Sequence, residues 1–133
     1  MKIMVCGPIA YGDIKRIKEL QKLLKERGFE VIDQFQSKEM DYNNIGDFRD
    51  KRELARKIVE NDLKFVGECD IIVAICDEPS FGTAMEIYHA RKLGKKIVIL
   101  NEHAQPSPWP VAFSDQVVRS LEELVEAMLK LGF

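Results

Sequence analysis

Two kinds of hydrophobic pattern alternate along the chain. Short runs of consecutive apolar residues, such as residues 3–6 and 71–75, are typical of strands covered on both faces. Between such runs, apolar residues recur at helical spacing on stretches that also carry many charges. The patterns together predict strands over residues 3–6, 29–35, 71–75 and 97–100, and helices over residues 14–27, 54–66, 82–93 and from 121 onward.

Strands that alternate with helices predict a mostly parallel sheet with helices on both faces, joined by right-handed crossovers. We therefore predict an α/β fold with a doubly wound parallel sheet of about five strands, Rossmann-like or flavodoxin-like. The uninterrupted apolar run 71–75 is the best candidate for the centre of the sheet. A length of 133 residues fits one domain over residues 1–133.

Two segments show neither the hydrophobic pattern of a strand nor that of a helix. Residues 36–50 are polar and rich in turn formers, and long connections of this kind are where mobile lids and binding loops are found. Pro106, Pro108 and Pro110 surround Trp109 and predict an irregular stretch before the last helix. Either segment could contribute to a binding surface.

Composition narrows the function classes. A formal net charge of −2 argues against a nucleic-acid-binding surface, which needs an excess of Lys and Arg, so a small ligand is favoured. No apolar run approaches the length of a membrane span, and the chain begins on a strand pattern rather than a secretory signal, so we expect a cytoplasmic protein. Cys6, Cys69 and Cys76 form no Cys-x-x-Cys pair, and we expect reduced, buried thiols.

The loops that follow the predicted strands meet at one end of the sheet, where ligands bind in folds of this kind. The loop 77–83 leads directly into a helix, whose free amide groups favour an anion, and Ser80 lies at that helix start. Glu86 is expected in the first turn, where a carboxylate tends to stay ionised as a nucleophile requires. The alternative is structural, with Glu86 complementing the helix dipole and Ser80 only capping the helix.

Asp62 is a second candidate carboxylate. It lies four residues after Ile58 and four before Val66, on the stripe of its helix that should face the core. An acid there is either directed at a ligand or reaches solvent or a backbone amide at the helix edge.

Other chemistries have weaker support in the sequence. Glu86 and His89 have a spacing that can hold a metal, but the motif occurs once, whereas carboxylate-bridged sites use it twice, so we predict no metal. The fingerprints of dinucleotide and triphosphate binding are absent. Tyr11 could stack on a base or simply pack.

The sequence resembles the nucleoside 2-deoxyribosyltransferases and, more closely, their relatives the 2'-deoxynucleoside 5'-phosphate N-hydrolases. The resemblance covers most of the chain, with agreement in order and spacing, and is strongest over Asn61–Leu63, Cys69–Ala74, Pro79–Glu86, Ala90 and Gly94–Ile97.

The resemblance implies a role for each candidate residue. Glu86 would be the nucleophile on the anomeric carbon, Asp62 would orient and protonate the departing base, and Ser80 would contact the 5'-phosphate. Ser114 would reach the phosphate of a neighbouring subunit, which implies a homodimer or larger oligomer. The other residues expected to line the substrate site are Gly7, Pro8, Ile9, Tyr11 and Gly82.

Two positions depart from the family pattern. Met4 stands where relatives often carry a tyrosine near the nucleophile, and Ala10 stands where the hydrolases carry an arginine. We predict hydrolysis of a deoxynucleoside monophosphate through a glycosyl-enzyme, without a cofactor. The alternatives are deoxyribosyl transfer between bases by the same intermediate and a nucleotide-binding sensor that does no chemistry.

Overall fold

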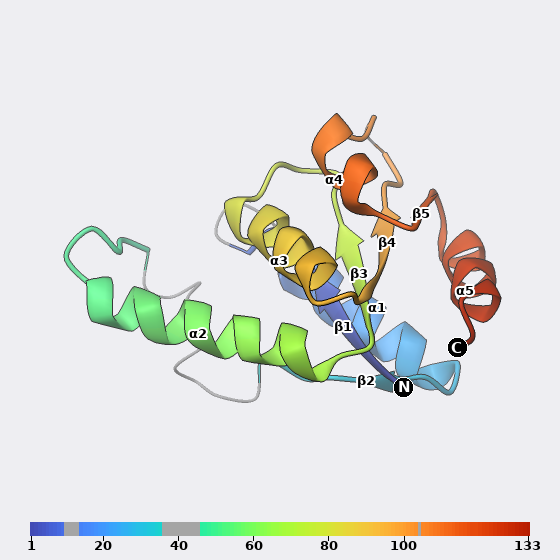
Figure 1. The fold of residues 1–133 in the computed structure, drawn as a ribbon, viewed down its shortest axis with the longest axis horizontal. Coiled ribbons are helices and arrows are strands. Elements are labelled where there is room, and N and C mark those ends of the chain that lie inside the picture. The colour runs from blue at the N-terminus through green and yellow to red at the C-terminus, as the bar shows by residue number, and fades with distance from the viewer. Residues whose placement is uncertain (10–13, 36–45, 104) are drawn as a thin grey trace.

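Five parallel strands form the sheet at the centre of the protein (Figure 1). The computed structural model describes residues 1–9, 14–35, 46–103 and 105–133. The strands are β1 (Lys2–Cys6), β2 (Glu30–Val31), β3 (Ile71–Ile75), β4 (Lys96–Leu100) and β5 (Gln116–Val118). Their order in space is β2-β1-β3-β4-β5, which confirms the predicted doubly wound parallel sheet and places β3 at its centre.

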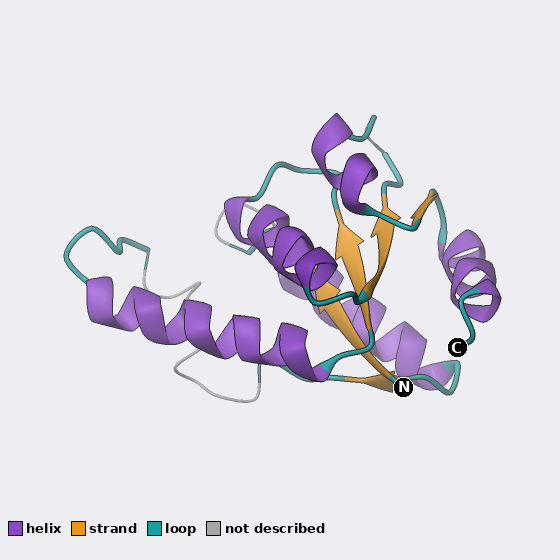
Figure 2. Ribbon diagram, viewed as in Figure 1, coloured by secondary structure: helices purple, strands orange, loops and turns teal. Residues whose placement is uncertain are grey.

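Helices cover both faces of the sheet, so that the strands are enclosed between them (Figure 2). The helices are α1 (Ile14–Glu26), α2 (Arg52–Glu68), α3 (Phe81–Lys92), α4 (Pro108–Phe113) and α5 (Leu121–Lys130). Buried residues of α1 and α5 pack on one face, whereas those of α2 and α3 pack on the other. In the described part of the chain, no helix combines the length and the apolar character needed to cross a bilayer.

The central strand shows how the apolar run serves both faces. Ile71, Val73 and Ile75 belong to the core beneath α1 and α5. Ile72 and Ala74 belong to the core beneath α2 and α3. Successive side chains of a strand point to opposite faces, and every residue of β3 is buried, so an uninterrupted apolar run is required there.

The second strand is shorter than the predicted range 29–35. Only Glu30–Val31 pair with β1, at the edge of the sheet. Beyond this pair the side chain of Gln34 takes the place of a backbone partner, because its Nε2 donates to the carbonyl oxygen of Val5 at 2.6 Å. A side-chain amide thus provides the hydrogen bond to the Val5 carbonyl oxygen, where the strand pattern predicted backbone pairing.

The proline-rich stretch was predicted to be irregular, and this was wrong. Ser107 caps α4 by accepting from the backbone N–H of Trp109 at 3.3 Å, and Pro108 begins the helix. Pro110 also falls within the first turn, where a backbone N–H has no partner inside the helix and its loss costs little. The prolines here start a helix instead of preventing one.

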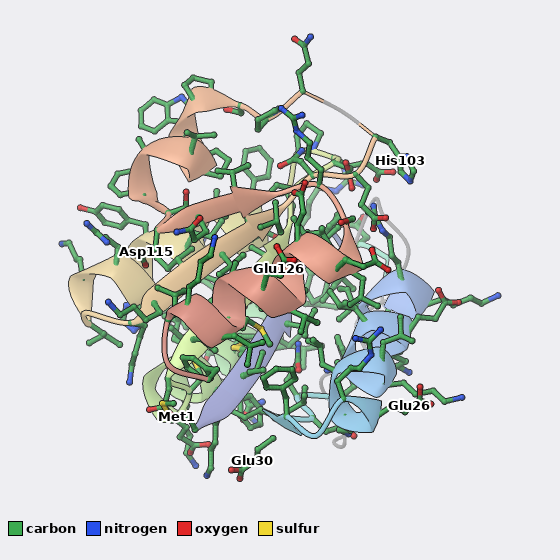
Figure 3. The ribbon with its side chains drawn as sticks, turned by 90° about the vertical axis from the view of Figure 1, so that its right-hand side faces the viewer. Met1, Glu26, Glu30, His103, Asp115 and Glu126 are labelled. Carbon is green, nitrogen blue, oxygen red and sulfur yellow. The ribbon has the colours of Figure 1, made fainter. Side chains whose placement is uncertain are left out.

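The carboxyl ends of the strands lie at one end of the molecule. Met1 and Glu30, at the amino ends of β1 and β2, lie far from His103, which follows β4 (Figure 3). The loops that follow β1, β3 and β4 therefore gather at the His103 end.

Candidate active site

Glu86 lies on α3 and its side chain turns toward the sheet. The residue is half-buried, and Oε2 accepts a hydrogen bond from Sγ of Cys6 at 3.3 Å. A side chain added at Gly82 would place its Cβ 3.8 Å from Oε1 of Glu86. Oε1 therefore faces Gly82 on the preceding turn.

The expected charge state of Glu86 was wrong. The helix begins at Phe81, one residue earlier than predicted, and its first turn contains no acidic residue. Glu86 therefore lies beyond the turn where the helix dipole acts strongly. Burial, with a further contribution from the charge of Asp62, raises the pKa of Glu86 to about 8, and the hydrogen bond from Cys6 opposes this rise.

Asp62 comes to the same place from α2. It lies between the buried residues Ile58 and Val66 on the core-facing side of that helix, as its spacing predicted. Burial raises the pKa of Asp62 to about 6. Because its charge acts on Glu86, the structure brings together two carboxyl groups with raised pKa values, which is typical of acid–base sites.

Ser80 forms the N-cap of α3. Its Oγ accepts from the backbone N–H of Thr83 at 3.3 Å and from Oγ1 of Thr83 at 3.0 Å. The capping role that the sequence left open is therefore present. Since both bonds use the oxygen of Ser80 as acceptor, its hydroxyl hydrogen remains able to donate to a ligand.

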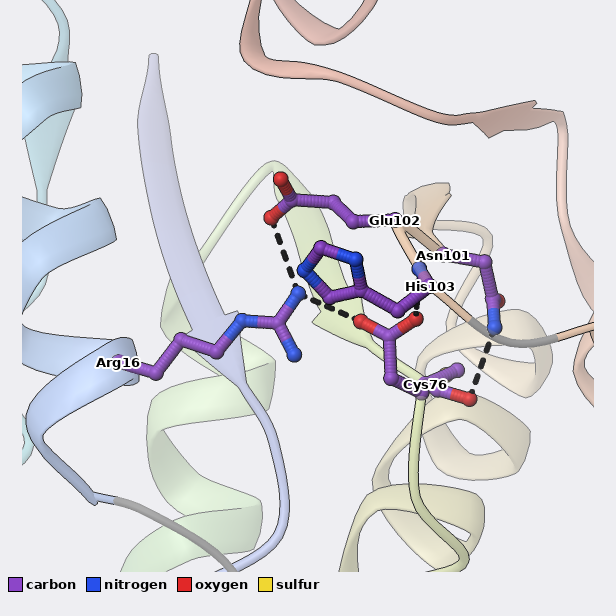
Figure 4. A network of polar contacts seen from close by, with 6 residues as sticks. Arg16, Cys76, Asn101, Glu102 and His103 are labelled. Carbon is purple, nitrogen blue, oxygen red and sulfur yellow. Dashed lines mark hydrogen bonds and ion pairs between the residues drawn. The ribbon is translucent and has the colours of Figure 1, made fainter.

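The loop that carries Ser80 is anchored at its start by charged contacts (Figure 4). Arg16 reaches from α1 to bind both Asp77, which follows β3, and Glu102, which follows β4. Asp77 also accepts from the backbone N–H of His103 at 2.9 Å. The network ties the loops after β3 and β4 to α1 and so fixes the entry to α3.

The loop after β1 has a mainly structural part in the described residues. A Cβ at Gly7 would lie 3.1 Å from Cγ1 of Ile17, so the glycine permits the close approach of α1. Pro8 is buried, and Ile9 packs against the core on the α1 face. Tyr11, the expected aromatic contact, falls outside the described residues.

Ser114 lies at the end of α4, far in the sequence from Glu86 and Asp62. Its hydroxyl donates to the carbonyl oxygen of Val111 at 3.0 Å. Phe113, the residue before it, packs its ring edge-on against Tyr88 of α3 with centroids 5.5 Å apart. Ser114 is half-buried, and its hydroxyl bonds within its own helix and not with Glu86.

The three cysteines are free thiols, as expected, but their burial differs from the prediction. Cys6 and Cys69 are buried, whereas Cys76 is only half-buried because it lies where β3 leaves the core. The contact of Cys6 with Glu86 was missed because a cysteine ending an apolar run reads as a small hydrophobe. Across the described ranges, no cluster of three or more His, Cys, Asp and Glu side chains is arranged to hold a metal ion.

The sequence profile of the nucleoside 2-deoxyribosyltransferases matches residues 3–128. The chain belongs to the nucleoside 2-deoxyribosyltransferase family. This family comprises N-deoxyribosyltransferases and N-hydrolases, so the chain is an enzyme of the hydrolase or pentosyltransferase type. The family assignment therefore favours an enzyme over a nucleotide-binding sensor that does no chemistry.

Individual relatives agree with the family. A Thermofilum pendens protein with the provisional name 2'-deoxynucleoside 5'-phosphate N-hydrolase 1 is 28% identical over 103 residues, or 75% of this chain and 67% of the relative. Two solved structures share the fold. A 2-deoxyribosyltransferase of Bacillus psychrosaccharolyticus has a TM-score of 0.72 at 18% identity, covering 93% of this chain and 90% of its own. A CMP N-glycosidase of Clostridium botulinum has a TM-score of 0.57 at 22% identity, covering 96% and 98%.

Proposed function

We propose that this family member is a cytoplasmic N-glycosidase that cleaves the bond between base and sugar in 2'-deoxynucleoside 5'-monophosphates. The observation that carries the proposal is the pair of half-buried carboxyl groups, Glu86 and Asp62, presented by neighbouring helices with raised pKa values. Glycosidic bonds are commonly broken by two carboxyl groups, one as nucleophile and one as acid.

In the first step, ionised Glu86 attacks the anomeric carbon of the sugar. The bond to the base breaks as the ester bond to Glu86 forms, and the base departs with a proton from Asp62. In the second step, water attacks the same carbon. Asp62 takes a proton from this water, and Glu86 is released as a carboxylate with the free sugar phosphate.

The pKa values of the two residues supply the single proton that this mechanism needs, but in the free enzyme they place it on the opposite residue. With pKa values of about 8 and about 6, the pair holds one proton near neutral pH. In the free enzyme this proton favours Glu86. The reactive form has the same number of protons but carries the proton on Asp62, where the departing base can use it.

The phosphate is proposed to lie at the amino end of α3. The free N–H groups of a helix start favour an anion, and the Ser80 hydroxyl hydrogen is available to donate. The anchoring of this loop through Arg16 and Asp77 supports a preformed site. The provisional name of the Thermofilum pendens relative agrees with a 5'-phosphate on the substrate.

A second candidate function is transfer of deoxyribose between bases. The family profile and the Bacillus psychrosaccharolyticus neighbour both favour it, because both are deoxyribosyltransferases by name. The two functions share the glycosyl-enzyme and differ in whether water or a second base resolves it.

One experiment separates these functions. The enzyme is incubated with each deoxynucleoside 5'-monophosphate, the matching deoxynucleosides and CMP, with and without a second base, and the free bases are separated by chromatography. Release of base without an acceptor, fastest from deoxynucleotides, supports the proposal. Exchange that requires an acceptor supports transfer, and no reaction with any substrate contradicts both.

We also propose that the enzyme is a homodimer or larger oligomer in which Ser114 serves the site of a neighbouring subunit. Phe81, Met85 and Tyr88 are 87%, 67% and 48% exposed and share one face of α3. Trp109, on the adjacent α4, is 73% exposed. Large apolar side chains gathered in this way are typical of a protein interface, and Ser114 ends the same α4 helix.

A further inference from the structure

The thiol of Cys6 contacts Glu86, the proposed nucleophile, but has no part in the two-carboxyl mechanism described above. Cys6 ends β1, is 2% exposed, and belongs to the core on the α2 and α3 face. Its Sγ lies 3.3 Å from Oε2 of Glu86. Among the residues that the structure describes, this thiol is the only hydrogen-bond donor to the Glu86 carboxyl group.

The thiol stays protonated and therefore acts as a donor. Burial, followed by the charge of Glu86, raises the pKa of Cys6 well above its usual range. A thiolate at this position would also repel the carboxylate. Cys6 thus enters the site as a neutral S–H group, neither a nucleophile nor a base.

The two oxygens of Glu86 have different surroundings. Oε2 is held by the thiol, whereas Oε1 faces Gly82, where an added Cβ would lie 3.8 Å away. A carboxylate fixed through one oxygen presents the other in a constant direction, which is what an attack on the sugar carbon requires.

We propose that Cys6 is a positioning residue that holds Oε2 of Glu86 and thereby directs Oε1 at the sugar. The inference rests on the proposed role of Glu86 as nucleophile. No bond to sulfur forms or breaks, and the thiol keeps its proton in both steps. The hydrogen bond also favours the ionised form of Glu86 over the neutral form, so it supports the reactive arrangement of the shared proton.

Other titratable groups interact with the same carboxyl group, so the variants that test Cys6 must leave these groups unchanged. Asp62 acts on Glu86 from α2, and Cys69, the C-cap of α2, lies near enough for its own pKa to be affected by Glu86. Cys69 is a useful control because it is also buried and free, while its Sγ donates to the carbonyl oxygen of Val66 at 3.2 Å.

The test compares Cys6→Ala, Cys6→Ser and the matched control Cys69→Ala. We measure kcat and KM for deoxynucleotide cleavage across pH, together with thermal unfolding. Removal of a hydrogen bond to a charged group is expected to lower kcat about tenfold or more in Cys6→Ala, with KM little changed. The hydroxyl of Cys6→Ser is expected to restore part of this loss, and Cys69→Ala is expected to leave kcat unchanged.

A second measurement does not depend on activity. Carbon-13 NMR titration of the Glu86 carboxyl group should give a higher pKa in Cys6→Ala than in wild type, and a pKa in Cys6→Ser that is lower than in Cys6→Ala. Equal pKa values in all three proteins would overturn the inference, and so would a wild-type kcat in Cys6→Ala. Glu86→Gln in the same assay separates the two hypotheses: activity in that variant removes the proposed function, whereas an inactive Glu86→Gln beside a fully active Cys6→Ala removes only the role of Cys6.

Discussion

The charge of Asp62, on α2, raises the pKa of Glu86, on α3, beyond the value that burial alone would give. Each residue therefore affects how readily the other performs its proposed role. An ionised nucleophile requires a neutral neighbour, and a protonated Asp62 is also what the departing base requires. The pair works only when it holds a single proton.

This requirement predicts a bell-shaped dependence of kcat/KM on pH. Below about pH 6 the pair gains a second proton and no carboxylate remains to attack, because the lower of the two pKa values is about 6. Above about pH 8 the pair loses its last proton and the base departs unassisted. Steady-state rates on a deoxynucleotide between pH 5 and pH 9 provide the check, and a constant rate over that range would contradict the shared-proton mechanism.

Glu86→Gln is expected to abolish base release, to less than about a hundredth of wild-type turnover, because an amide cannot form the glycosyl ester. The same change is expected to stabilise the fold. A carboxyl group whose pKa is raised by folding favours the folded state below its ordinary pKa of 4.5, and this advantage is lost as the pH rises toward 8. Glutamine has no proton to lose, so the variant should gain about 3 kcal/mol over wild type at about pH 7.

Urea unfolding of both proteins at several pH values measures this gain. The difference should be small near pH 4.5 and should grow up to about pH 8. A Glu86→Gln protein that is less stable than wild type at every pH would show that the carboxyl group is not destabilised by burial.

Asp62→Asn is expected to slow base release most for bases that leave poorly without a proton, since the amide cannot supply one. Removing the charge should also lower the pKa of Glu86, because that charge is one cause of its rise. Rates on a series of bases, together with the pH profile, test both effects. An equal small loss on every base would make Asp62 a structural residue.

The sequence predicted the architecture well because a strand that is buried on both faces has an uninterrupted run of apolar residues. The run 71–75 was the best candidate for the central strand, and it forms β3. The position of Asp62 was predictable for a similar reason, since helical spacing alone puts it on the core-facing side of α2. These features depend on residues that are close in the sequence.

The charge state of Glu86 and its contact with Cys6 depend on packing between distant segments. The two residues are 80 positions apart, and no local pattern reports that the thiol and the carboxyl group meet. Helix position alone predicted an ionised Glu86, but the residue lies beyond the first turn of α3 and its burial raises its pKa. Local reasoning failed here because desolvation is a property of the folded chain.

Met85→Glu is expected to disrupt the proposed dimer, because it places a charge in the middle of the exposed apolar face of α3. Leu129→Glu is the matched control, since Leu129 is 60% exposed but lies on α5, which covers the opposite face of the sheet. Sedimentation equilibrium should show loss of the dimer only in Met85→Glu. Dissociation in neither variant, or in both, would contradict an interface on α3.

If Ser114 serves the neighbouring subunit, two inactive variants should restore activity when mixed. Glu86→Gln lacks the nucleophile, and Ser114→Asp would place a negative charge against the partner's phosphate. A mixed dimer contains one site with both native residues, so co-refolded protein should recover up to about a quarter of wild-type activity on monophosphates. If a sample that sediments as a dimer recovers no activity, Ser114 does not serve the site of the neighbouring subunit.

The choice between nucleotides and nucleosides is tested at Ser80. Asp and Asn can both replace a serine cap, so Ser80→Asp and Ser80→Asn should preserve the start of α3, where Ser80 now accepts from Thr83. Only Ser80→Asp adds a negative charge beside the proposed phosphate. At about 4 Å and an effective dielectric near 20, this repulsion is on the order of 4 kcal/mol, more than the roughly 1.5–3 kcal/mol of a hydrogen bond to a charged group. Ser80→Asp should therefore depress kcat/KM on monophosphates far more than on the matching nucleosides, while Ser80→Asn shows a weaker bias in the same direction. If each variant loses the same factor on both substrate types, Ser80 acts only as a cap and the phosphate lies elsewhere.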